Sequence, residues 1–135
     1  MSLHDIERKK MIQMASDARA RAYCPYSKYA VGACLKGESG AYYMGCNIEN
    51  AAYGASNCAE RTAVFKAISE SERSFSALVI VTGGSVIGTP CGICRQVLAE
   101  FADDEMIIVC ANTKGEFTET KLGELLQNAF RADSL

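Results

Sequence analysis

Two short, uninterrupted apolar runs constrain the fold of this chain more than any other feature. Residues 77–82 read ALVIVT, and residues 106–111 read MIIVCA. Uniform runs of this length are typical of strands that are covered on both faces, because a half-exposed strand alternates apolar and polar side chains. Each run follows a segment with helical spacing, residues 58–69 and 91–101. The alternation predicts helices on both sides of one sheet.

The other predicted elements are an opening helix, a hairpin, a closing strand and a last helix. They cover residues 5–23, 29–35 with 42–46, 116–120, and 122–129. The hairpin follows from the turn-like sequence KGESG between its two strands. The predicted fold class is therefore α/β, a three-layer α/β/α sandwich around a mixed five-stranded sheet.

Length and charge exclude several classes of protein. The 135 residues are most economically one domain, 1–135. The formal net charge is -2 and the isoelectric point is near 5.4, so the chain has no bulk attraction for phosphate backbones or anionic lipids. We expect a small neutral ligand in place of a nucleic-acid polymer.

The N-terminal sequence and the cysteine count indicate the compartment. No window has the 18 or more apolar residues of a membrane span, and the first twenty residues mix charged and apolar groups, unlike a signal peptide. We therefore expect a cytoplasmic protein without a membrane partner. Seven cysteines, two of them in a C-x-x-C, indicate metal or redox chemistry more readily than a disulfide framework.

Three of the cysteines have the placement of zinc ligands. Cys91 and Cys94 lie three residues apart at the start of one predicted helix, and Cys58 opens another. If the N-termini of these helices lie together, three thiolates converge where both helix dipoles are positive. Catalytic Zn²⁺ has three protein ligands and one open position. We expect Thr89 to cap the second helix and Pro90 to begin it.

Two charged residues follow Cys58 closely. Glu60 is too near Cys58 in a helix to be an ideal fourth ligand, but it is well placed to exchange protons with a metal-activated water. Arg61 lies three residues after Cys58, so its guanidinium can fold back and donate hydrogen bonds to sulfur. We hypothesise that Arg61 offsets the negative charge of three thiolates on one Zn²⁺.

Four segments together resemble a known family. Residues 57–63 (NCAERTA) and 90–96 (PCGICRQ) are similar to the paired signatures of zinc-dependent cytidine deaminases. Residues 25–33 (PYSKYAVGA) and 45–53 (GCNIENAAY) are similar to the first-strand and ribose-binding segments of the same family. With cysteine in the first ligand position, the chain resembles the small homotetrameric members of the cytidine/deoxycytidylate deaminase-like family.

The resemblance implies an activity and a set of site residues. It implies hydrolytic deamination of cytidine and 2'-deoxycytidine to uridine and 2'-deoxyuridine, a step of pyrimidine salvage that releases ammonia. One Zn²⁺ per subunit is held by the three cysteines, and Glu60 protonates N3 and the departing ammonia. Asn47 and Glu49 bind the ribose hydroxyls, and the backbone around Ala59 contacts the base edge.

Two aromatic residues complete the implied site. Tyr29 stands where the family usually has the phenylalanine that packs by the base, so its hydroxyl needs a partner or solvent. Phe130 matches an aromatic residue that a neighbouring subunit stacks on the base. The resemblance thus implies a homotetramer with shared sites.

Other interpretations of the same residues remain open at this point. A structural zinc site would take a fourth thiolate from among Cys24, Cys34, Cys46 and Cys110, although those within apolar runs are more simply buried hydrophobic residues. A redox C-x-x-C would leave Cys58 and Glu60 without a role. Within the enzyme class, the alternative is deamination of another aminopyrimidine compound such as blasticidin S.

Overall fold

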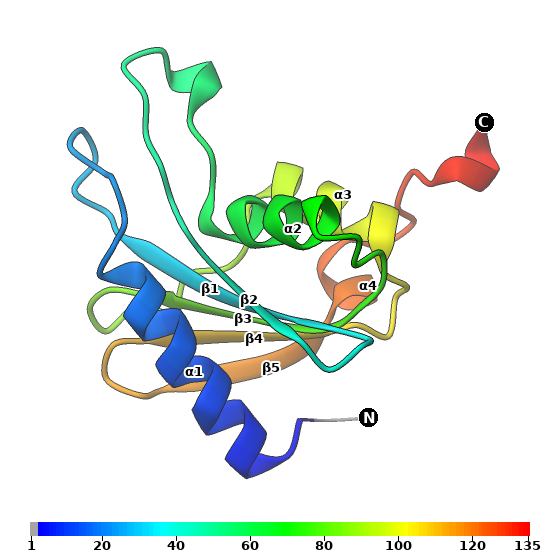
Figure 1. Cartoon of the computed structure of the whole chain (residues 1–135), viewed down its shortest axis with the longest axis horizontal. Helices are drawn as coiled ribbons and strands as arrows, with labels where there is room; N and C mark the ends of the chain where they lie inside the picture. Colours follow the sequence, from blue (N-terminus) through cyan, green and yellow to red (C-terminus); the bar gives the residue numbers. More distant parts are fainter. Residues whose placement is uncertain (1–2) are drawn as a thin grey trace.

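A computed structural model describes residues 3–135, and its centre is a five-stranded sheet (Figure 1). The strands lie in the order β2-β1-β3-β4-β5. Their bounds are β1 (Val31–Gly37), β2 (Tyr42–Cys46), β3 (Phe75–Thr82), β4 (Ile107–Asn112) and β5 (Phe117–Lys121). β3 and β4 are parallel and the other neighbours are antiparallel, so the predicted mixed five-stranded sheet is confirmed.

Helices cover both faces of this sheet. They are α1 (Asp5–Arg19), α2 (Ala59–Ser69), α3 (Gly92–Phe101) and the short α4 (Leu122–Leu125). Two 3₁₀ turns, η1 (Tyr53–Ala55) and η2 (Ala132–Ser134), lie outside these layers. Figure 1 shows α1 on one face and α2 with α3 on the other, which confirms the three-layer prediction.

The two apolar runs fill both halves of the core, as their uniform composition predicts. Successive residues of a strand point to opposite faces of a sheet. Leu78 and Ile80 of β3 therefore pack in the cluster under α2 and α3, whereas Val79 and Val81 pack under α1. All four are at most 1% exposed. An alternating sequence at these positions would leave one helical layer without a partner.

Several element boundaries differ from the predicted ones. The first helix ends at Arg19 instead of residue 23, because Tyr23 pairs with Ile48 in an isolated bridge and so takes an extended conformation. The last helix ends at Leu125 instead of residue 129, and the backbone turns at Asn128, which has a φ of 54°.

Gly45 on β2 allows α2 to approach the sheet closely. A Cβ atom at this position would lie 2.5 Å from the carbonyl oxygen of Ala59 and 2.5 Å from the amide nitrogen of Ala63. The first turn of α2 therefore rests directly on the backbone of β2. None of the helices within residues 3–135 has the length and apolar character needed to cross a membrane.

Candidate metal centre

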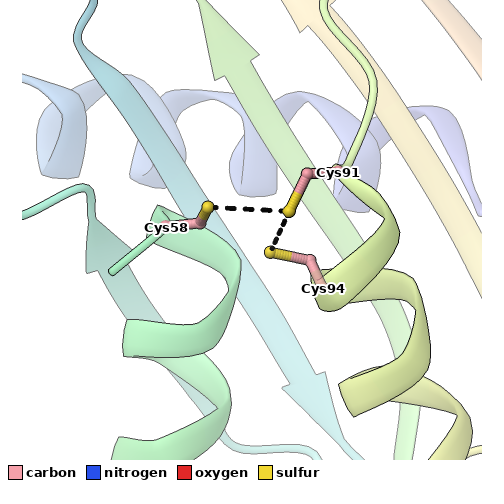
Figure 2. Close-up of side chains that lie close together, drawn as sticks. All are labelled: Cys58, Cys91 and Cys94. Atoms are coloured by element: carbon pink, nitrogen blue, oxygen red, sulfur yellow. Dashed lines mark hydrogen bonds between the residues drawn. The ribbon is translucent and has the colours of Figure 1, made fainter. Parts of the chain in front are cut away.

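Three thiols converge between the N-terminal ends of α2 and α3, as the sequence predicts (Figure 2). The Sγ atom of Cys91 lies 3.7 Å from that of Cys58 and 3.3 Å from that of Cys94. All three sulfur atoms lie within 4.8 Å of one another. Among residues 3–135, this is the group of cysteine, histidine and carboxylate side chains compact enough to hold a metal ion.

The ends of the two helices fix the directions of these side chains. Cys58 is the N-cap residue of α2 and Cys91 is the N-cap residue of α3, and both have extended backbone conformations. The predicted cap at Thr89 and helix start at Pro90 are therefore wrong, since α3 begins at Gly92. Cys94 lies in the first turn of α3, which brings its sulfur to the same side as Cys91.

The three thiols fit a tetrahedral zinc ion. Zinc–sulfur bonds of about 2.3 Å at tetrahedral angles separate two sulfur ligands by about 3.8 Å. The 3.7 Å between Cys58 and Cys91 is close to this value, and the 3.3 Å between Cys91 and Cys94 needs only a small rotation. Thiolates are also the protein ligands that structural and catalytic zinc share. No fourth side chain joins the cluster within the described part of the chain, which argues against a structural four-cysteine site.

Glu60 is a buried acid beside this cluster. Its exposed fraction is 4%, and it lies in the first turn of α2. Burial raises the pKa of the Glu60 carboxyl to about 7, and the negative charge of Cys58 acts in the same direction. A carboxyl group with these surroundings exchanges a proton near neutral pH.

Arg61 supplies positive charge to the thiol cluster. Its Nη2 atom donates a hydrogen bond of 3.2 Å to the Sγ atom of Cys58, as the hypothesis from the sequence requires. The interaction with the Cys94 thiol, followed by that with Arg61, lowers the pKa of Cys58 to about 5. The same coupling raises the pKa of Cys94. The thiol of Cys58 therefore ionises readily.

A cavity of about 190 Å³ opens over the cluster. It is lined by Tyr29, Val31, Asn47, Cys58, Ala59, Glu60, Ile80, Thr82, Thr89 and Cys91. The structure therefore brings together six of the residues selected from the sequence. The sequence analysis missed the lining residues at the carboxyl end of β3, although the position of Thr82 as the polar last residue of the run 77–82 is a signal that identifies it.

Asn47 organises one wall of the cavity through the backbone. Its Oδ1 atom accepts a hydrogen bond of 2.8 Å from the amide of Val31, and its Nδ2 atom donates one of 2.8 Å to the carbonyl oxygen of Tyr29. These bonds hold residues 29–31 against the loop that follows β2, which explains why β1 begins at Val31 and not at the predicted Tyr29.

Glu49 and Phe130 do not line the cavity in this chain. The Oε1 atom of Glu49 accepts backbone hydrogen bonds of 3.1 Å from Tyr26 and from Ser27, and its Oε2 atom accepts a bond from the Ser27 hydroxyl. Phe130 is 60% exposed, and its carbonyl oxygen accepts a hydrogen bond of 2.7 Å from Gln96. The roles of Glu49 and Phe130 as substrate contacts therefore remain predictions.

Comparison with known proteins identifies the family. Residues 5–110 match the family model described as the cytidine and deoxycytidylate deaminase zinc-binding region. The chain belongs to this family. A cytidine deaminase from Sporosarcina psychrophila is 50% identical over 131 residues, which cover 97% of this chain and 95% of that one. A cytidine deaminase from Halalkalibacterium halodurans is 43% identical, with 96% of this chain and 98% of the relative covered.

Solved structures of the family share the fold. The crystal structure of cytidine deaminase from Burkholderia pseudomallei matches with a TM-score of 0.87 and 42% identity, over 90% of this chain and 98% of that chain. The crystal structure of cytidine deaminase from Mycobacterium tuberculosis matches with a TM-score of 0.81 and 37% identity, over 93% and 98% of the two chains. The zinc-binding character of the family agrees with the metal site at Cys58, Cys91 and Cys94 and with one zinc ion per subunit.

Proposed function

We propose that this protein is a zinc-dependent hydrolase that deaminates cytidine and 2'-deoxycytidine to uridine and 2'-deoxyuridine and releases ammonia. The observation that carries the proposal is the buried carboxyl of Glu60 at the floor of a cavity that also contains Cys58 and Cys91. A structural metal site has no use for such a carboxyl beside the metal. The names of the relatives support cytidine as the substrate.

Cys58, Cys91 and Cys94 are the residues that would hold the zinc ion. When bound, Zn²⁺ supplies the Lewis acid that activates water for attack on an amidine carbon. The overall change adds water to C4 of the pyrimidine and breaks the bond between C4 and the exocyclic nitrogen. The chain itself has to move protons, bind the nucleoside and hold the metal ligands.

Glu60 moves the protons in this proposal. It takes one proton from the attacking water and delivers it to N3 of the base, and then takes the second proton of the same water from the oxygen added at C4 and delivers it to the nitrogen that leaves as ammonia. General acid and base catalysis of this kind contributes about 10²- to 10⁴-fold in rate. Arg61 keeps Cys58 ionised by donating to its sulfur atom, and so acts through the ligand and not on the substrate.

The substrate contacts follow from the cavity and from the family. Ala59 lines the cavity in the first turn of α2, where backbone amides lack helical partners and are suited to hydrogen bonding with the base edge. Tyr29 lines the same cavity and is suited to packing by the base. Asn47 and Glu49 are proposed to contact the ribose, which in the case of Glu49 requires its carboxylate to leave or share the bonds with Ser27.

The proposal extends to assembly and location. We propose a single domain over residues 1–135 that forms a homotetramer, in which an exposed Phe130 of one subunit stacks on the base bound by a neighbour. Reduced thiols are required for zinc binding, and all seven cysteines are free. A reducing cytoplasm agrees with that requirement, and a role in pyrimidine salvage agrees with the proposed nucleoside deamination.

The test is ultraviolet absorbance with purified, zinc-replete protein and three substrates, cytidine, 2'-deoxycytidine and cytosine, alongside metal analysis. We expect loss of absorbance with both nucleosides and one zinc ion per chain. The variant Glu60→Gln should lower kcat by at least about 10²-fold and retain zinc. Glu100→Gln is the matched control, because Glu100 is an exposed acid on α3. A zinc-replete wild type that leaves cytidine unchanged contradicts the proposal and directs attention to other aminopyrimidines such as blasticidin S.

A further inference from the structure

We propose that Gly88 is a positioning residue that makes room for the phenol of Tyr29 and so sets the wall of the cavity over the metal centre. The inference rests on the proposed function for its kinetic readout. Gly88 lies in the connection between β3 and α3, far in sequence from Tyr29, and the sequence analysis gave it no role.

The contact between the two residues is steric. A Cβ atom built on Gly88 would lie 2.7 Å from the Oη atom of Tyr29 and 2.7 Å from the Cγ2 atom of Thr82. Ordinary van der Waals contacts of a Cβ atom begin at about 3.4 Å, so any side chain at residue 88 displaces both neighbours. The hydroxyl of Tyr29 and the methyl group of Thr82 thus occupy space that only glycine leaves free.

The backbone conformation does not explain glycine at this position. Among residues 3–135, the glycines with positive φ are Gly40, Gly84 and Gly115. Gly88 is outside that set, so an L-residue with a side chain could adopt its backbone conformation. The requirement for glycine therefore comes from two neighbouring side chains, those of Tyr29 and Thr82.

A hydrogen bond with Thr82 fixes the position of Gly88 relative to the sheet. Thr82 is 2% exposed at the carboxyl end of β3, and its Oγ1 atom accepts a hydrogen bond of 3.0 Å from the amide of Gly88. This bond fixes the distance between the backbone at residue 88 and the sheet. The loop is consequently unable to absorb an added methyl group by moving outward without losing the bond.

The backbone of Tyr29 is fixed as well. Its amide donates a hydrogen bond of 3.0 Å to the Ser27 hydroxyl, and its carbonyl oxygen accepts the bond of 2.8 Å from Asn47. Tyr29 is half-exposed, so its side chain has room to move where its backbone has not. An added methyl group at residue 88 therefore rotates the ring about its side-chain bonds and changes the shape of the cavity that Tyr29 lines.

The oxygen atom of Tyr29 makes the contact with residue 88. Phenylalanine at residue 29 would lack the atom that lies 2.7 Å from a Cβ atom on Gly88. Because Cys58, Glu60 and Cys91 lie elsewhere in the cavity, a displaced ring should affect substrate binding more than the chemical step.

The experiment is a double-mutant cycle on the zinc-loaded protein. KM and kcat for cytidine are measured for wild type, G88A, Y29F and the double variant Y29F/G88A. We expect G88A to raise KM by about fivefold or more in the Tyr29 background, with a smaller change in kcat. In the Y29F background, the fold increase in KM caused by G88A should be smaller by a factor of at least about two, because the oxygen atom is absent. G54A is the matched control, since a methyl group at Gly54 meets open space.

The outcomes separate the two proposals. Equal effects of G88A on KM in both backgrounds, within about twofold, overturn the pairing of Tyr29 with Gly88. If the wild type does not deaminate cytidine, the proposed function fails, and a crystal structure of zinc-loaded G88A then decides the pairing. A rotated Tyr29 ring supports it, whereas an unmoved ring with a shifted loop overturns it.

Discussion

Removing Arg61 tests the electrostatics of the metal centre. Three thiolates on one Zn²⁺ carry a formal charge of about -1. The guanidinium of Arg61 lies 3.2 Å from the sulfur of Cys58 and brings the summed charge of the zinc, the three thiolates and Arg61 close to zero. The substitution Arg61→Met keeps much of the side-chain length and removes the charge, so the partly buried negative charge at Cys58 is left without its partner.

The expected magnitude follows from the position of Arg61 behind a metal ligand. Loss of a group that orients a ligand costs about 10- to 100-fold in metal affinity or activity, or about 1.4 to 2.7 kcal/mol. The loss should fall toward the upper end of this range, because Arg61 also lowers the pKa of Cys58 and so increases its thiolate fraction. Arg61→Lys retains the charge without the planar donor group and should give a smaller loss.

The assay is competition for zinc with a chelator of known affinity, followed by kcat/KM for cytidine in zinc-saturated samples. Arg73→Met is the control, since Arg73 is exposed and its Nη1 atom donates to the carbonyl oxygen of Ile68, away from the thiols. Unchanged zinc affinity and unchanged turnover in both Arg61 variants refute the reasoning. If Arg61→Met fails to fold, the Arg61→Lys measurement alone carries the test.

Two further predictions concern stability. Gly45→Ala places a methyl group 2.5 Å from the backbone of α2 and should cost about 1–3 kcal/mol of unfolding free energy, measured in urea. Gly54→Ala is the control and should cost far less, because a methyl group there meets open space. Equal losses in the two variants would count against the close contact. The hydrogen bonds from Lys36 and then Tyr42 hold the pKa of Glu7 below its usual value, so the stabilisation by Glu7 is present at neutral pH and is lost on acidification. The difference in stability between wild type and Glu7→Gln should shrink from about pH 5 to about pH 3, and a difference independent of pH contradicts the assignment.

Local patterns in the sequence predicted much of the fold. The uniform runs at residues 77–82 and 106–111 identified the two parallel central strands, because burial on both faces removes polar alternation. The hairpin strand at residues 42–46 was predicted with the bounds that β2 has in the structure. Boundaries failed where tertiary contacts override local preference, as at the end of α1, where Tyr23 pairs with Ile48.

The metal ligands were predictable because their spacing encodes their geometry. A C-x-x-C at a helix start places two thiols on one side, and a third cysteine opening a second helix needs only that the helices lie side by side. That condition belongs to the fold, and Gly45 contributes to it by letting α2 rest on β2. The cap prediction at Thr89 and Pro90 was wrong because the extended N-cap position is occupied by Cys91 itself.

The layered architecture, the three thiol ligands and the acid next to them follow from the amino-acid sequence, since each depends on spacing within one or two neighbouring elements. The burial of Glu60, the hydrogen bonds of Asn47 with residues 29–31 and the contact of Gly88 with the phenol of Tyr29 come instead from long-range packing. These relations join segments that are distant in the chain. No local periodicity records such contacts, because they depend on how the sheet and its connections bring the segments together.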